Sequence, residues 1–434
     1  MNYQEAMEYM EKVGTYGIVP GLDSIRELCR RLGNPQDELK FVHIAGTNGK
    51  GSTLAYISSI LQAAGYRVGK YISPVIIEYC EKIQIGKQKI THKDLCEGLE
   101  IIKKHCDAMV SDGLHHPTPF EIETALAFWY FREKQCDIVV LETGMGGRED
   151  ATNLITTTQV AVLASIGMDH MKFLGNSLEE IAAHKTGICK PGCQVVSMRQ
   201  KEAAQKVVEQ TAAELGCILT IADAANAKHV KYGLKKQNFD YGNYKKLEIT
   251  LAGKFQVANA VLAVEAVQAL GKCGYEIKEA ALRKGLRETV WNGRLQILEE
   301  HPLFIVDGAH NEDAAAKLAD SIEFYFTNKR IIYIMGMLKD KEVDRVIALT
   351  EKYADQILTV TPPNNPRAMH AYDLATEVAK VHPNVTAVDS LELSHLLAGR
   401  DDVILCFGSL SYLGRILKLM EKRQTAGNKR KAKR

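Results

Sequence analysis

The chain has 434 residues, of which 46% are hydrophobic and 25% charged, and these values are those of a soluble protein with two or three domains. Its formal net charge of +2 gives no general case for nucleic-acid binding. No apolar run is long enough to cross a bilayer, and the N-terminus lacks a basic start followed by a hydrophobic stretch. We therefore expect a cytoplasmic monomer that binds neither nucleic acid nor membranes.

In the first two thirds of the chain, β-rich apolar runs alternate with helical patterns, which predicts a parallel sheet covered by helices on both faces. The expected strands are Phe41–Ala45, Ile138–Glu142, Val160–Ile166 and Gln194–Met198, and the expected helices include Phe120–Glu133, Lys201–Leu215 and a buried helix at Gln256–Leu270. The sequence therefore predicts a large α/β domain of the phosphate-loop type over residues 1–293.

A second alternating series follows at the spacing of βαβ units. Its expected strands are Leu303–Val306, Ile331–Met335, Ile357–Val360 and Val403–Phe407. These predict a smaller, doubly wound α/β domain over residues 294–425, joined to the first by a linker at Glu288–Arg294. The basic residues 426–434 are expected to be a disordered tail.

One glycine-rich segment, Val42–Thr53, carries the strongest functional signal. It is predicted to be a buried strand, a glycine turn and a helix, an arrangement that directs backbone N–H groups and a helix N-terminus toward a phosphate. Ile44 stands where the usual phosphate loop has its first glycine, and Gly51 separates Lys50 from the hydroxyl group of Ser52. The candidate ligands of a triphosphate are Thr47, Asn48, Gly49, Lys50, Gly51 and Ser52.

Polar residues follow two further strands of the predicted large domain. Glu142 precedes a glycine turn, a position that suits a Mg²⁺ ligand, since hard cations take oxygen ligands. Asp169 and His170 follow the next strand, and a lone histidine there would usually be an ordinary surface or core group. Lys185 lies in a predicted helix, where its spacing indicates no more than a solvated lysine.

In the second half, Asp307 and His310 follow a strand and precede a helix. They could hold a ribose, a base or an amino acid. The alternative is that they form only a helix cap and a turn. The ligand-binding interpretation is favoured if Arg294 of the linker points into the same cleft. Ser409, after the last strand, is a further candidate for a substrate contact.

One segment resembles the phosphate loop of the Mur ligase superfamily, namely Ala45-Gly46-Thr47-Asn48-Gly49-Lys50-Gly51-Ser52-Thr53. It is most similar to the loop of the folylpolyglutamate synthase and dihydrofolate synthase branch. The resemblance covers nearly the whole chain. It includes Gly21–Ile25, Leu32–Gln36, Asn365–Ala368 and Gly408–Leu410. Members of this superfamily are ATP-dependent ligases that form amide bonds.

The resemblance implies roles for individual residues. Gly49–Ser52 would cradle ATP, Ser73 and Glu142 would share one Mg²⁺, and His170 would hold a second. Lys185 would be carbamylated, which turns a cation that repels metal ions into an anion that faces them. Lys50, Lys185 and His170 would be catalytic. The residues implied to contact ATP are Asn259, Arg294 and Asp307, and those implied to lie around the acid substrate are Thr118, Phe120, Glu121, Asp150, Ala151 and Thr152. By their positions after strands, His310 remains a candidate for the nucleotide site and Ser409 for a substrate contact. The resemblance also allows a monovalent cation.

Three departures from the family pattern bear on substrate choice. Val75 and Ile76 stand where the family commonly has His-Leu, and Lys82 stands where it has arginine, which removes a bidentate hydrogen-bond donor. Phe255 replaces the histidine that usually precedes Gln256.

The expected function is therefore ATP-dependent addition of L-glutamate to the carboxylate of a folate or dihydropteroate through an acyl phosphate. Two alternatives remain open. One is a Mur-type ligase for another acid, and the other is a nucleotide-binding regulator without ligase activity.

Overall fold

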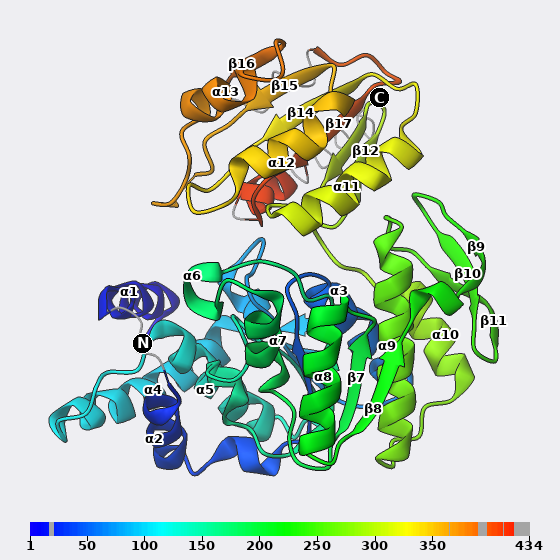
Figure 1. The fold of residues 1–434 in the computed structure, drawn as a ribbon. Coiled ribbons are helices and arrows are strands. Elements are labelled where there is room, and N and C mark those ends of the chain that lie inside the picture. The colour runs from blue at the N-terminus through cyan, green and yellow to red at the C-terminus, as the bar shows by residue number, and fades with distance from the viewer. Residues whose placement is uncertain (17–20, 364, 389–396, 411, 421–434) are drawn as a thin grey trace, which may run out of the picture.

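The computed structural model describes residues 1–434 except 17–20, 364, 389–396, 411 and 421–434, and the tail expected at 426–434 therefore lies outside the described residues. The chain folds into two α/β parts, which we call the large and the small domain (Figure 1). None of the described helices combines the length and apolar character that crossing a bilayer requires.

The large domain contains a sheet with the strand order β4-β3-β2-β5-β1-β6-β7-β8. These strands are β1 (Phe41–Ala45), β2 (Val68–Tyr71), β3 (Ile83–Ile85), β4 (Gln88–Lys89), β5 (Ile138–Glu142), β6 (Thr158–Leu163), β7 (Gln194–Met198) and β8 (Ile218–Ala222). From β2 to β8 all neighbours are parallel, whereas β3 and β4 form an antiparallel edge. The expected strand at residues 160–166 starts two residues earlier and ends at Leu163, because the residues after it turn toward the phosphate loop, where Thr47 N–H donates to Ser165 O at 2.7 Å.

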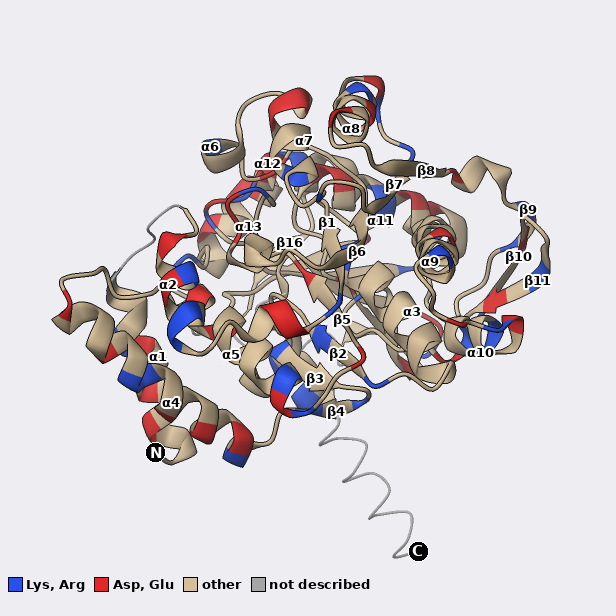
Figure 2. Ribbon diagram, turned by 90° about the horizontal axis from the view of Figure 1, so that it is seen from below, with Lys and Arg blue, Asp and Glu red and all other residues tan. Residues whose placement is uncertain are grey.

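Helices cover both faces of this sheet. They are α1 (Tyr3–Val13), α2 (Asp23–Arg31), α3 (Lys50–Ala63), α4 (His92–Ser111), α5 (Pro119–Glu133), α6 (Met171–Leu174), α7 (Leu178–Thr186), α8 (Glu202–Glu214), α9 (Phe255–Lys272) and α10 (Glu279–Glu288). Helices α3 and α9 pack on one face in a single hydrophobic cluster, and α9 is buried nearly all round, as its sequence predicts. On the other face α4 and α5 form a separate cluster. Lys and Arg are interspersed with Asp and Glu on outer helices such as α1 and α4, in keeping with the low net charge (Figure 2).

A small antiparallel sheet lies beside α9 and α10, a feature that the sequence analysis did not predict (Figure 1). It consists of β9 (Lys228–Lys231), β10 (Gln237–Tyr241) and β11 (Tyr244–Ile249). Its apolar side chains alternate with exposed lysines, and Phe239, Leu247 and Ile249 enter the same core cluster as α9. The sheet is therefore part of the large domain.

The small domain contains a second sheet with the order β12-β13-β17-β14-β15-β16, parallel except for the β12–β13 pair. Its strands are β12 (Gln296–Glu300), β13 (Leu303–Val306), β14 (Ile331–Met335), β15 (Gln356–Thr359), β16 (Val385–Ala387) and β17 (Val403–Phe407), and its helices include α11 (Glu312–Tyr325), α12 (Val343–Thr350) and α13 (Ala371–Ala379). The carboxyl ends of β13 and β17 face the large domain, so residues that follow them can reach its phosphate loop (Figure 1).

Candidate active site between the two domains

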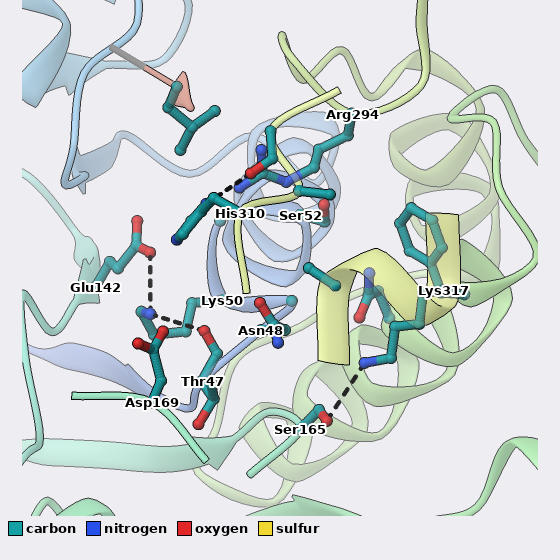
Figure 3. Close-up of a pocket in the computed structure, with 18 of the residues that line it drawn as sticks. Thr47, Asn48, Lys50, Ser52, Glu142, Ser165, Asp169, Arg294, His310 and Lys317 are labelled. Atoms are coloured by element: carbon teal, nitrogen blue, oxygen red, sulfur yellow. Dashed lines mark hydrogen bonds and ion pairs between the residues drawn. The ribbon is translucent and has the colours of Figure 1, made fainter. Parts of the chain in front are cut away.

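A cavity of about 400 Å³ lies between the two domains (Figure 3). The large domain contributes the phosphate loop, the ends of β5 and β7, the residues that follow β2, β5 and β6, and the first turn of α9. The linker contributes Arg294, and the small domain contributes Asp307–His310 and one face of α11. The cavity is therefore assembled from segments far apart in sequence, as is usual for ligand sites at domain junctions.

The phosphate loop is held in shape by close backbone contacts. Gly49 has φ of +90°, and a Cβ atom there would lie 2.6 Å from Asn259 Oδ1, so both conformation and space require glycine. No side chain caps α3, so its first N–H groups are available to an anion. Lys50 Nζ donates to Gly46 O at 3.1 Å, and Gln256 Nε2 donates to Ser52 Oγ at 3.2 Å. The predicted phosphate-binding residues thus share one wall of the cavity.

Glu142 is a buried carboxylate with weak compensation. Its Oε2 accepts a long hydrogen bond of 3.4 Å from the N–H of Ser73, and its Oε1 lies 4.0 Å from Lys50 Nζ. Burial raises the pKa of Glu142 to about 7, although the Lys50 charge opposes this rise. A carboxylate and a serine side by side, with few other partners, form an oxygen-rich position that fits a hard divalent cation.

His170 and Asp169 lie at the cavity where the domains meet. The His170 side chain is 43% exposed and its Nε2 lies 3.9 Å from Asp169 Oδ1. Asp169 also accepts a hydrogen bond of 3.0 Å from Asn311 Nδ2 and lies 3.3 Å from Lys341 Nζ, both of the small domain. Burial would raise the pKa of Asp169, yet the Lys341 charge lowers it to about 2. Asp169 is therefore an anion that joins the two domains.

Lys185 is buried near the end of α7, not solvated as its spacing alone suggests. Burial, followed by repulsion from Lys50, lowers the pKa of Lys185 to about 7. Among the described residues no carboxylate lies within ion-pair distance of it, and it is not one of the residues that line the cavity. Nor could any group of three or more described His, Cys, Asp or Glu side chains hold a metal ion by itself. A cation here would also need hydroxyl or ligand oxygens.

The residues predicted in the linker and the small domain, Arg294, Asp307 and His310, line the wall of the cavity that faces the large domain. Asp307 is buried and accepts hydrogen bonds from the N–H groups of Leu295 (2.9 Å) and Ala309 (2.8 Å), so it ties the linker to the loop after β13. His310 Nδ1 lies 2.7 Å from Gly308 O and must donate to it. Burial lowers the pKa of His310 to about 4, so the ring is neutral and its Nε2 is an acceptor. Arg294 does line the cavity, and its Nη1 donates to Gly293 O at 2.9 Å.

The residues predicted to contact the acid substrate form tightly bonded motifs next to the cavity. Thr118 and Glu121 make a capping box at the start of α5, which holds the ring of Phe120 over Gly144, a cavity-lining residue. Asp150 and Thr152 bond to each other and support the loop after β5, and Ala151 and Ser409 are buried. Two of these side chains reach a residue of the cavity wall, because the ring of Phe120 packs over Gly144 and the carboxylate of Asp150 accepts a hydrogen bond from the backbone of Gly144.

Comparison with known proteins identifies the family. Residues 44–267 match the Mur ligase middle domain and residues 293–410 match the Mur ligase glutamate ligase domain. The chain belongs to the Mur ligase family. It is 36% identical over 428 residues to the dihydrofolate synthase/folylpolyglutamate synthase of Bacillus subtilis, which covers 96% of this chain and 99% of that protein. This places it in the dihydrofolate synthase/folylpolyglutamate synthase branch.

Solved structures of Mur ligases from this branch share the fold. The Mycobacterium tuberculosis folylpolyglutamate synthase complexed with ADP and AMPPCP superposes with a TM-score of 0.88 at 27% identity, covering 96% of this chain and 99% of that one. Escherichia coli FolC in complex with DHPP and ADP gives 0.85 at 29% identity, covering 98% and 99%. The predicted family, fold class and ligase activity are therefore confirmed.

Several cavity residues of this Mur ligase were missed by sequence analysis. Lys317 of α11 lines the cavity and its Nζ donates to Ser165 Oγ at 3.4 Å, at the opposite end from Glu142 (Figure 3). Asn311 Nδ2 and Asn48 Oδ1 are 3.5 Å apart across the domain boundary. Asn311 is marked locally only as the N-cap of α11, and no local pattern marks Lys317. Their partners lie more than 140 positions away and meet them only when the two domains pack together.

Proposed function

We propose that this protein is an ATP-dependent ligase that joins L-glutamate to the carboxylate of a folate or dihydropteroate through an acyl phosphate. The observation that carries the proposal is a cavity between two domains in which Lys50 of the phosphate loop lies 4.0 Å from the buried carboxylate of Glu142. The family relationship supports the reaction class, since the B. subtilis relative is a dihydrofolate synthase/folylpolyglutamate synthase.

In this proposal the triphosphate lies along the loop from Thr47 to Ser52, on the free N–H groups at the start of α3. Ser73 and Glu142 would hold one Mg²⁺, and His170 a second. Bound there, Mg²⁺ would neutralise phosphate oxygens and offset the poorly compensated charge of Glu142. Lys50 would stabilise the charge on the transferred phosphoryl group, since catalysis of phosphoryl transfer is mainly positioning and electrostatics.

The reaction then has two steps. An oxygen of the substrate carboxylate attacks the γ-phosphorus, the bond to the β-phosphate oxygen breaks, and ADP leaves. The amine of glutamate attacks the resulting acyl phosphate, an amide bond forms, and inorganic phosphate leaves. The amine must lose its extra proton, and the neutral His310 offers Nε2 as an acceptor for it at the cavity wall.

The acid substrate would enter beside Phe120. The capping box of Thr118 and Glu121 and the turn of Asp150–Thr152 would act by fixing Phe120 and the loop after β5. The acyl phosphate must be protected from water, and the bonds of Asn311 and Lys341 to Asp169 would keep the domains together while it exists.

Lys185 is proposed to carry a carbamate. A pKa of about 7 leaves much of the amine neutral near neutral pH, and the neutral amine adds CO₂ and releases one proton to give the carbamate anion. The anion would replace a cation that Lys50 repels, and it would face the cations held by His170 and Glu142.

The test is ADP release measured with each combination of ATP, Mg²⁺, glutamate and a pterin substrate. The proposal expects ADP only when the pterin acid and glutamate are both present, with a product heavier by one glutamate. ADP release that needs a different acid would indicate another Mur-type ligase. ADP release without any acid, or none under all conditions, would support a nucleotide-binding regulator.

A further inference from the structure

The chain has two tryptophans, and one of them lies directly on the phosphate loop. Trp291 belongs to the linker, and Gly51 is the second residue of α3. A Cβ atom on Gly51 would lie 2.5 Å from Cζ2 and 2.9 Å from Cε2 of Trp291. The indole ring thus touches the backbone between Lys50 and Ser52. This contact leaves no room for a side chain at position 51 while the ring is in place.

The linker before the tryptophan is anchored to the large domain. Thr289 is buried, and its Oγ1 donates to Gly285 O at 2.7 Å at the end of α10. Thr250 Oγ1, after β11, donates to Thr289 O at 3.1 Å. Trp291 itself packs against the core cluster that contains α3 and α9. The ring therefore packs between Gly51 and this core cluster.

The linker after the tryptophan is bonded to the small domain. Gly308 N–H donates to Gly293 O at 2.9 Å, and Leu295 N–H donates to Asp307 Oδ2 at the same distance. Arg294 lies between these two bonds and lines the cavity opposite Lys50 (Figure 3). Five consecutive residues therefore connect the phosphate loop to the loop that carries His310.

We propose that Trp291 is a positioning residue, which sets the phosphate loop against the linker so that nucleotide binding and the placement of the small domain depend on each other. The inference rests on the proposed use of ATP. Without the ring, the first turn of α3 would lose its outer support, and the N–H groups that hold the triphosphate would be less well ordered.

Kinetics distinguish positioning from a merely structural role. Trp291→Ala is expected to raise KM for ATP by roughly tenfold while KM for the pterin substrate stays within about twofold, and Trp291→Phe is expected to recover most of the loss. The matched control is Trp129→Phe, because Trp129 packs on Gly98 in the α4–α5 cluster and does not line the cavity. Equal rises of both KM values, or no rise, would overturn the proposal.

A double-mutant cycle tests the contact itself. Gly51→Ala places a methyl group against the ring and should raise KM for ATP by roughly tenfold or more, whereas in the Trp291→Ala background the same change should cost less than about threefold. An equal cost in both backgrounds would mean that the methyl group meets the phosphate and not the indole, and would overturn the proposal.

Fluorescence gives a measurement that needs no turnover. The Trp129→Phe protein retains Trp291 as its single tryptophan and should show a saturable change in emission when ADP is added, and the Trp291→Phe protein should show none. The reverse pattern would overturn the proposal. If the protein bound ADP but formed no amide, the proposed ligase function would be refuted. The fluorescence test of the contact between Trp291 and the phosphate loop would still be valid, because it depends only on nucleotide binding.

Discussion

Glu142 and Asp150 are both buried carboxylates close to the end of β5, yet their partners differ greatly. Asp150 accepts hydrogen bonds of 3.0 and 2.6 Å from the N–H and Oγ1 of Thr152 and of 2.7 Å from the N–H of Met145. Glu142 has one bond of 3.4 Å and a lysine 4.0 Å away. A carboxylate that accepts several short hydrogen bonds, such as Asp150, stabilises the conformation of its loop. A buried carboxylate with few hydrogen bonds, such as Glu142, is available to bind a cation.

Two lysines repeat this contrast on the neighbouring elements. Burial lowers the pKa of both Lys185 and Lys190. Lys190 Nζ donates to Asn153 Oδ1 at 2.9 Å and to Asn153 O at 3.2 Å, and so supports the turn after Asp150. Lys185 has no ion-pair partner among the described residues. The comparison thus separates groups that hold the site together from groups that act in it, and it supplies matched controls.

The largest effect is expected for Lys50→Met. The change removes the charge beside Glu142 and the transferred phosphoryl group, so kcat should fall by about 10³-fold or more, while the melting temperature stays close to that of the unchanged protein. ADP formation under saturating substrates measures it. Lys103→Met, which alters an exposed pair with Asp107 on α4, is the control and should keep full activity. Normal turnover of Lys50→Met would contradict the phosphate-loop assignment.

Lys185→Ala should lower kcat by about 10²-fold, because the anion on this side of the site is lost. Short carboxylic acids that fit the vacated space should restore part of the rate. Lys190→Met should instead lower the free energy of unfolding by about 1 to 2 kcal/mol with kcat within about threefold of normal, since its hydrogen bonds are structural. An active Lys185→Ala protein, unaffected by added acids, would show that Lys185 carries no carbamate.

Glu142→Gln should raise the Mg²⁺ concentration needed for half-maximal rate by roughly tenfold. The free energy of unfolding of the unchanged protein should fall as the pH rises, whereas a salt-bridged carboxylate, whose pKa is lowered, adds stability as the pH rises. Burial raises the folded-state pKa of Glu142 from 4.5 to about 7, so the stabilisation from its bound proton is complete below pH 4.5 and is lost as the pH rises through 7. At pH 8 without Mg²⁺, the glutamine protein should therefore be more stable by up to about 3 kcal/mol.

Mg²⁺ should then stabilise the unchanged protein and leave Glu142→Gln almost unaffected, as followed by thermal unfolding with and without the ion. Asp150→Asn is the matched control. It should lose stability at every pH, because its hydrogen bonds need the second carboxylate oxygen, and its Mg²⁺ requirement should not change. If Asp150→Asn raised the Mg²⁺ concentration needed for activity and Glu142→Gln did not, the cation would bind at Asp150 and not at Glu142.

The smallest effect is expected for Thr118→Ala, which removes the N-cap of α5. It should lower the free energy of unfolding by about 1 kcal/mol and raise KM for the pterin substrate only slightly, because Thr118 acts through the position of Phe120. Thr91→Ala, at the cap of α4, is the control for a cap remote from the cavity and should have a similar stability effect and an unchanged KM. A KM rise of more than about tenfold for Thr118→Ala would indicate direct contact with the substrate.

The sequence was most informative where function depends on local chain geometry. The phosphate loop, the strand end at Glu142 and the turn at Asp307–His310 each lie within a few consecutive residues, so spacing and turn chemistry predicted them. The two sheets followed from the alternation of strand and helix patterns. Strands β2, β8, β12 and β16, the short edge strands β3 and β4 and the β9–β11 sheet were not predicted, because their place in a sheet is defined by pairing partners elsewhere in the chain.

Burial and pairing could not be predicted from the chain. The spacing of Lys185 indicates a solvated lysine, and its buried position follows from the packing of α7. Likewise Lys317, Asn311 and Lys341 enter the site from the small domain, and Trp291 reaches Gly51 from the linker. These contacts depend on how the two domains pack, which local patterns do not record.

A cavity whose walls come from two domains has a consequence for heat denaturation. Each sheet has its own main hydrophobic cluster, and the domains are joined both by polar contacts such as Asn311 with Asp169 and by apolar residues of the large domain, such as Ala252 and Phe255, that pack on the small-domain core. Each domain can therefore begin to melt at its own temperature, although the shared contacts couple the two transitions. A nucleotide that touches both walls stabilises only the state in which both are folded. Calorimetry should therefore show two overlapping transitions for the free protein that merge into one as nucleotide is added, with a midpoint that climbs with nucleotide concentration.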